Sequence, residues 1–223
     1  MKAIAIDYYG TLVDVGQPFL QIKNWIINKH GDSAHSSKKI YSAFFKEHVR
    51  LIYSRNFMLG QQLLMSSYIK ACDKFGVEPY HEGFMDIIYG LFTSAKPFKG
   101  AVDTVRRLRE EYPVLLLTNA DNVILYKSIE MNGFEFDYIV SSEDQKCNKP
   151  NERIFREACK QLLMPPEQVL MVGDSLVEDI HGALAFGMKA LWINAGGGPT
   201  RGISVPQITT IGDLCLKIPE IGL

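Results

Sequence analysis

Apolar and polar residues alternate along this chain in two different ways. From Gly100 onward, short apolar runs rich in β-branched residues are separated by amphipathic segments of helical length, and a similar apolar run opens the chain. This alternation is typical of a parallel sheet whose strands are joined by crossover helices. Because each run is almost continuously apolar, we expect helices on both faces of the sheet. The predicted strands are 3–7, 114–118, 138–141, 169–173 and 190–193, and the predicted helices are 101–111, 121–132, 151–163 and 178–186.

The segment 17–95 follows the second pattern. Its apolar residues recur at three- and four-residue steps, as in Leu64, Tyr68 and Cys72, which predicts successive helices with packed faces and no strand. Connector-like residues stand at both of its ends, at 15–18 and 96–100. The sequence therefore predicts an α/β core domain formed by 1–16 and 96–223, with a helical domain inserted at 17–95.

The composition of the chain argues against two classes of binding partner, nucleic acids and membranes. The chain has 223 residues, a net charge of −1 and 22% charged residues, so it lacks the basic excess of proteins that bind nucleic acid or anionic membranes. No apolar stretch approaches the roughly 20 residues of a membrane helix, and no signal-peptide core is found. Four cysteines without CxxC spacing indicate scattered thiols. We expect a cytoplasmic monomer or homodimer that acts on a small anionic substrate and binds neither nucleic acid nor membrane.

Polar residues end the first two predicted strands, at the edge where open α/β sheets place their ligands. Asp7 ends the first strand. There it is a candidate nucleophile or metal ligand, or it only caps the following turn. Thr118 and Asn119 end the second and can donate hydrogen bonds to an anion, although Thr118 also suits a helix N-cap.

Two further positions carry charge after later strands. Lys149 precedes Pro150 and can offset the charge of a carboxylate and an oxyanion, or is an ordinary loop lysine. The turn from Asp174 to Asp179 offers carboxylates of the kind that bind Mg²⁺, or that only complement a helix dipole.

These four signals follow successive strands in an order that resembles motifs I to IV of the haloacid dehalogenase-like superfamily. The resemblance covers nearly the whole chain and puts 17–95 in the place of the family's helical cap. Motif I, Asp-Tyr-Tyr-Gly-Thr at 7–11, is the most specific of the four. The resemblance implies a doubly wound sheet of strand order 5-4-1-2-3, with the strand of Asp7 at its centre.

The resemblance also implies a role for each matched residue. Asp7 would be the nucleophile that forms a covalent aspartyl intermediate. Lys149 would neutralise charge, and Mg²⁺ would be bound by Asp174, Asp7 and the backbone carbonyl of Tyr9, with Asp179 supporting that site. The substrate anion would be held by Thr11, Thr118 and Asn119.

Motif I departs from the phosphatases of the superfamily. They carry a second aspartate, the general acid, where this chain has Tyr9. The motif here resembles the 2-haloacid dehalogenases, whose halide leaves without a proton and whose mechanism needs no metal. Tyr9 is therefore expected among the catalytic residues, in place of the acid.

Other positions depart from the dehalogenases. Asp174 and Leu176 stand where those enzymes have Ser and Asn, and Phe155 stands where they have a tyrosine. Their substrate-contacting cap arginine finds only a loose match in Lys46.

Three functions remain open at this point. Mg²⁺-dependent phosphoryl hydrolysis ranks first, because loss of the metal site costs phosphoryl transfer more than loss of the general acid. Metal-independent 2-haloacid dehalogenation ranks second, and a non-catalytic binding protein with the same fold ranks third. Phosphonate C–P cleavage also tolerates the missing aspartate, but no lysine of the inserted segment clearly matches the one that it uses.

Overall fold

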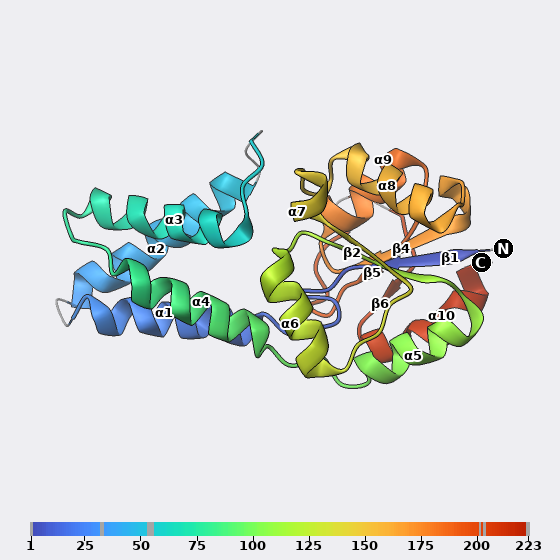
Figure 1. Cartoon of the computed structure of the whole chain (residues 1–223), viewed down its shortest axis with the longest axis horizontal. Helices are drawn as coiled ribbons and strands as arrows, with labels where there is room; N and C mark the ends of the chain where they lie inside the picture. Colours follow the sequence, from blue (N-terminus) through green and yellow to red (C-terminus); the bar gives the residue numbers. More distant parts are fainter. Residues whose placement is uncertain (1, 32–33, 53–55, 201, 203, 222–223) are drawn as a thin grey trace. The chain divides into compact units, whose positions relative to one another are not determined.

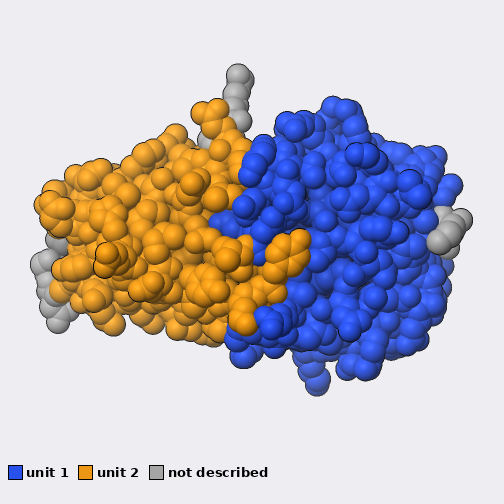
Figure 2. Space-filling model, viewed as in Figure 1, with its two compact units in different colours: residues 1–14, 96–122, 129–223 blue, residues 15–95, 123–128 orange. Residues whose placement is uncertain are grey.

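The computed structural model describes residues 2–31, 34–52, 56–200, 202 and 204–221. The chain forms two compact units, shown in different colours in Figure 2. Residues 1–14, 96–122 and 129–223 make the first unit, and residues 15–95 and 123–128 make the second. The second unit thus holds the segment in which the sequence predicts an inserted helical domain.

The first unit is built on a parallel sheet of six strands. Their order across the sheet is β3-β2-β1-β4-β5-β6, with β1 inside. The strands are β1 (Ala3–Ile6), β2 (Val114–Thr118), β3 (Tyr138–Ser141), β4 (Val169–Gly173), β5 (Lys189–Ile193) and β6 (Gln207–Ile208). The first five confirm the predicted order 5-4-1-2-3, and β6 is an addition at the edge beside β5.

Helices connect these strands, and a last helix follows β6. They are α5 (Ala101–Glu111), α6 (Asn122–Asn132), α7 (Ser142–Gln145), α8 (Glu152–Leu162), α9 (Gly182–Phe186) and α10 (Leu214–Ile221). Gly133 and Gly187 end α6 and α9 with left-handed φ angles of 71° and 96°, which confirms both as helix stops. The predicted helix 178–186 needs a correction, since a π-helix, η2 (Leu176–His181), precedes α9.

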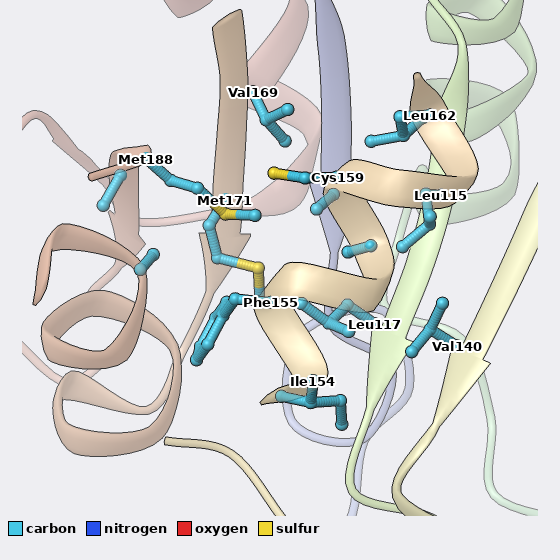
Figure 3. Packing of buried hydrophobic residues seen from close by; sticks show 14 of the residues in the cluster. Leu115, Leu117, Val140, Ile154, Phe155, Cys159, Leu162, Val169, Met171 and Met188 are labelled. Atoms are coloured by element: carbon cyan, nitrogen blue, oxygen red, sulfur yellow. The ribbon is translucent and has the colours of Figure 1, made fainter. Parts of the chain in front are cut away.

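Helices cover both faces of the sheet. In Figure 1, α8 and α9 lie on one face and α5 and α10 on the other. Figure 3 shows Phe155 and Cys159 of α8 packed against Leu115, Leu117 and Met171 of the strands, all of them buried. Because strand side chains alternate between faces, the residues between these point to the opposite layer. This double cover explains the continuously apolar strands.

Besides the part of α6 at 123–128, the second unit contains four whole helices within its described residues. They are α1 (Gly16–Lys29), α2 (Ala34–Ile52), α3 (Gly60–Lys74) and α4 (His81–Thr93). Rings fill its interior: Phe84 stacks on Tyr68 at 4.3 Å between centroids and meets Phe44 edge-on at 5.9 Å. The three- and four-residue steps in the sequence are therefore packing faces. Within the part of the chain that is described, no helix combines the length and the apolar character needed to cross a membrane.

Candidate active site

Lys149 lies at the centre of a buried charge cluster in the first unit. Its ammonium donates to Asp7 Oδ1 at 2.7 Å, to Asp179 Oδ1 at 2.6 Å and to the carbonyl oxygen of Leu117 at 2.8 Å. An ammonium has three N–H groups, and these bonds use all of them. Lys149, which is 3% exposed, is therefore fixed beside Asp7 at the end of β1.

The loop after β1 is joined to the loop after β4. Thr11 Oγ1 donates to Asp174 Oδ1 at 2.9 Å and accepts from the Asp174 backbone N–H at 3.0 Å. Gly10 has a φ of +95°, and a Cβ at this position would lie 2.6 Å from Asp174 Oδ2. Glycine is required here twice over, by its left-handed backbone and by the close approach of the carboxylate.

Asp179 is held from two sides within η2. Its Oδ1 accepts from Lys149, and its Oδ2 accepts from the backbone N–H of Ser175 at 3.0 Å. A Cβ on Gly173 would overlap the Asp179 side chain, so this position also requires glycine. Asp179 is thus packed behind the site, with both oxygens engaged.

Three carboxylates converge in this cluster. Oxygen atoms of Asp7, Asp174 and Asp179 all lie within 4.8 Å of one another, a grouping able to hold a metal ion. Glu178 is a fourth acidic residue nearby, and Lys149 is the cation that faces them. The described part of the site therefore carries more negative than positive charge.

Burial, together with repulsion among the carboxylates, raises the pKa values of Asp174, Glu178 and Asp179. Burial, then repulsion by Asp7, raises the pKa of Asp174 to about 6, and burial raises that of Glu178 to about 7. Burial also raises the pKa of Asp179 despite its ion pair with Lys149. Burial lowers the pKa of Lys149, but Asp179 and Asp7 more than offset it and the net shift is upward. A divalent cation would relieve the repulsion, and an all-oxygen donor set suits Mg²⁺.

Thr118 presents a buried hydroxyl that lacks a partner among the residues that the structure describes. The residue is 1% exposed, and its Oγ1 forms no hydrogen bond with any described residue. Buried polar atoms are nearly always hydrogen-bonded, so an unpartnered one calls for an explanation. A substrate oxygen would provide the missing partner. Thr118 does not cap the next helix, because Asp121 is at the N-cap of α6.

Asn119 is engaged within the protein. Its Oδ1 accepts from the backbone N–H of Lys149 at 2.7 Å, and its Nδ2 donates to the Lys149 carbonyl at 3.2 Å and to Glu178 Oε2 at 3.0 Å. The amide therefore binds the loop of Lys149, although the sequence predicts it as a substrate ligand. That role stays a prediction. Sequence reasoning did not single out Glu178, whose position in the acidic turn after β4 was the available signal.

The remaining predicted residues lie in different surroundings. Tyr9 is half-buried and meets the ring of Tyr8 edge-on at 4.9 Å. Lys46 is exposed on α2, in the second unit. Phe155, at the position of the dehalogenase tyrosine, is buried in the core and stacked on Phe186 at 6.1 Å.

The family follows from a sequence comparison. The model of the haloacid dehalogenase-like hydrolase family matches residues 1–187. This chain therefore belongs to the haloacid dehalogenase-like hydrolases, as its motifs predict, and it is a hydrolase.

Its relatives include enzymes of two kinds. The chain is 30% identical to glyceraldehyde 3-phosphate phosphatase of Pyrococcus furiosus, over 88% of this chain and 82% of the relative. It is 25% identical to (S)-2-haloacid dehalogenase 4A of Burkholderia cepacia, over 96% and 93% of the two chains. The structure of L-2-haloacid dehalogenase from Xanthobacter autotrophicus with chloropropionic acid covalently bound matches over the full length of both chains, with a TM-score of 0.81 and 16% identity. This last likeness shows the fold alone.

Proposed function

We propose that this hydrolase removes the phosphoryl group from a small phosphorylated metabolite, with Asp7 as the nucleophile and Mg²⁺ as the cofactor. The observation that carries the proposal is the grouping of the Asp7, Asp174 and Asp179 carboxylates within 4.8 Å of one another, with Lys149 paired to Asp7 and Asp179. A haloacid brings its own carboxylate, which would add to the negative charge of this cluster. A phosphate ester accompanied by a divalent cation would balance it.

Within the cluster, Asp7 and Asp174 are the direct Mg²⁺ ligands of this proposal, with the backbone carbonyl of Tyr9. Asp179 has both oxygens engaged, with Lys149 and Ser175, and acts by holding Lys149 in place. When bound, the ion would neutralise phosphoryl oxygens and reduce their repulsion by Asp7.

The reaction has two steps. An oxygen of Asp7 attacks phosphorus, and the bond from phosphorus to the leaving oxygen breaks to give an aspartyl phosphate and an alcohol, which takes up a proton. Water then attacks phosphorus, loses a proton, and restores the Asp7 carboxylate as inorganic phosphate departs. Lys149 holds Asp7 Oδ1 and thereby fixes the carboxylate for the attack. Thr118 donates its hydroxyl to a phosphoryl oxygen, and charge-assisted bonds of this kind are strong.

Tyr9 sets the range of leaving groups. A positioned general acid is typically worth about 10² to 10⁴ in rate, and this chain has a phenol where the acid stands in related phosphatases. The enzyme therefore favours phosphate esters whose leaving oxygen needs little protonation.

Residues 17–95 serve as the cap in this proposal and close over the site to exclude water. Lys46, exposed on α2, contacts the substrate anion there. Lys46→Ala should then raise KM with little change in kcat.

We further propose that the protein works in the cytoplasm as a monomer or homodimer.

Dehalogenation of 2-haloacids is the second candidate function, favoured by the tyrosine at position 9. It would use the same attack by Asp7, on carbon, with loss of halide and hydrolysis of the aspartyl ester by water.

A paired assay separates the two functions. Phosphate release is measured from a panel of small phosphate esters with Mg²⁺ and with EDTA, and chloride release from 2-chloropropionate in EDTA. We expect phosphate release that stops in EDTA and with Asp174→Ala. Chloride release in EDTA without any phosphatase activity would replace the proposal by the second function, and inactivity in both assays would favour a binding protein.

A further inference from the structure

Asn119 and Glu178 form a hydrogen-bonded pair beside the catalytic lysine. Asn119 follows β2 and Glu178 lies in η2, 59 residues further along the chain, yet Nδ2 and Oε2 are 3.0 Å apart. The same Nδ2 reaches the carbonyl of Lys149, and Oδ1 receives the N–H of Lys149. Asn119 thus hydrogen-bonds both backbone groups of Lys149. Glu178 accepts a further hydrogen bond from the side-chain amide of Asn119.

The amide has one allowed orientation in this setting. Turned over, its oxygen would face the Lys149 carbonyl and the Glu178 carboxylate, which are both acceptors, and its NH₂ would face the Lys149 N–H. Glu178, together with the backbone of Lys149, therefore fixes the orientation of the Asn119 amide. If Glu178 is replaced by a residue whose side chain cannot accept a hydrogen bond, Asn119 Nδ2 keeps only its bond to the Lys149 carbonyl.

The hydrogen bonds of Asn119 bear on the position of the Lys149 ammonium. The backbone of Lys149 determines where its ammonium lies, and the ammonium bonds Asp7 and Asp179 at 2.7 and 2.6 Å. Small misplacements in an active site are costly, since 1 Å can reduce a rate by about 10². Thr118, in contrast, has a buried hydroxyl with no partner among the described residues.

We propose that Asn119 and Glu178 are positioning residues for Lys149. Glu178 acts through its acceptor oxygen. The inference rests on the proposed function for its kinetic consequence, but the pairing of Asn119 with Glu178 does not depend on the reaction.

The test combines kinetics with binding of inorganic phosphate in the presence of Mg²⁺. For Asn119→Ala we expect a fall in kcat of roughly 10- to 100-fold with KM and phosphate Kd within about twofold of wild type, as expected for a displaced lysine. Glu178→Ala should lower kcat in the same way, and Glu178→Gln, which keeps an acceptor oxygen, should restore most of it. Thr118→Val should instead weaken phosphate binding.

A double-mutant cycle tests the pair itself. Asn119→Ala and Glu178→Ala should be non-additive, both in kcat and in the urea midpoint of unfolding, which needs no substrate. The matched control is the pair of Asn122 and Asp144, whose side chains are 2.7 Å apart and form no hydrogen bond with Lys149. Asn122→Ala and Asp144→Ala should be coupled in stability but leave kcat within about twofold of wild type.

Several results would overturn the inference. Weaker phosphate binding with unchanged kcat in Asn119→Ala would make Asn119 a substrate ligand, and additive effects would remove the coupling. A loss in Glu178→Gln equal to that in Glu178→Ala would mean that the charge acts, not the acceptor oxygen. If wild type releases no phosphate, the proposed function fails, while the unfolding cycle still decides whether the pair exists. Should Asn119→Ala not fold, the two Glu178 variants carry the same kinetic test.

Discussion

Thr11 and Asp174 bond each other twice, although 163 residues separate them in the chain. The threonine hydroxyl donates to the carboxylate and accepts from the backbone N–H of the same aspartate. These bonds join the loop that carries Asp7 to the loop that carries Asp174, so two predicted Mg²⁺ ligands are held at a set separation.

Thr11→Val should therefore weaken both stability and metal binding. Valine keeps the shape but leaves the part-buried N–H of Asp174 unpaired, which costs about 1–3 kcal/mol of unfolding free energy. We expect a lower urea midpoint and a Kd for Mg²⁺ raised at least several-fold, measured by calorimetry. Thr209→Val, at an exposed threonine, is the control. Unchanged Mg²⁺ affinity in Thr11→Val would show that the link does not organise the metal site.

Asp7→Asn should abolish turnover and leave the fold intact. The amide keeps the size of the side chain but loses the charge that attacks the substrate. Because Asp7 lies in a cluster with excess negative charge, loss of its charge relieves repulsion. We expect kcat to fall below detection and the Tm to stay equal to or above that of wild type. Retention of most of the turnover would exclude Asp7 as the nucleophile.

Tyr9→Asp should install the missing general acid. The gain should be largest for alkyl phosphates, whose leaving oxygen needs a proton, and small for aryl phosphates. We expect the ratio of alkyl to aryl kcat/KM to rise at least tenfold, measured on matched ester pairs with Mg²⁺. Tyr9→Phe, which removes only the hydroxyl, is the control that tests whether the phenol already supplies a proton. An equal change for both classes of ester would contradict this role.

His48 should make the stability of the second unit depend on pH. Burial lowers its pKa from 6.5 to about 4, and the ring stacks on Phe44 at 6.0 Å between centroids. Since the folded state disfavours the charged form, the contribution is fully present above pH 6.5 and is lost as the pH falls toward 4. The expected loss of unfolding free energy between pH 7 and pH 4 is roughly 3 kcal/mol.

His48→Phe should remove this part of the pH dependence, because the phenyl ring fills the same space and does not titrate. Urea denaturation at several pH values between 4 and 7 measures the slope. His81→Phe, at an exposed histidine of the same unit, is the matched control. A slope that is the same in His48→Phe and wild type would show that His48 is not the group responsible.

Local sequence pattern is enough to predict the elements of the core and the positions at which chemistry is expected. Apolar runs and amphipathic segments predicted five strands with few errors, because hydrophobic periodicity is a local property of the chain. The motif order predicted that Asp7, Lys149 and Asp174 would meet at one edge, since the carboxyl ends of parallel strands share that edge. The strand β6 was missed because two residues, of which only Ile208 is buried, carry no readable period.

Only the tertiary structure decided which partner each side chain has. Asn119 has donors and acceptors for an anion as well as for a backbone, and its choice of Lys149 and Glu178 depends on loops that are remote in sequence. That the Thr118 hydroxyl has no partner within the described part of the chain is likewise a property of its surroundings. Local pattern determines which way a residue faces, whereas hydrogen bonds form within about 3 Å and depend on how separate strand ends are brought together.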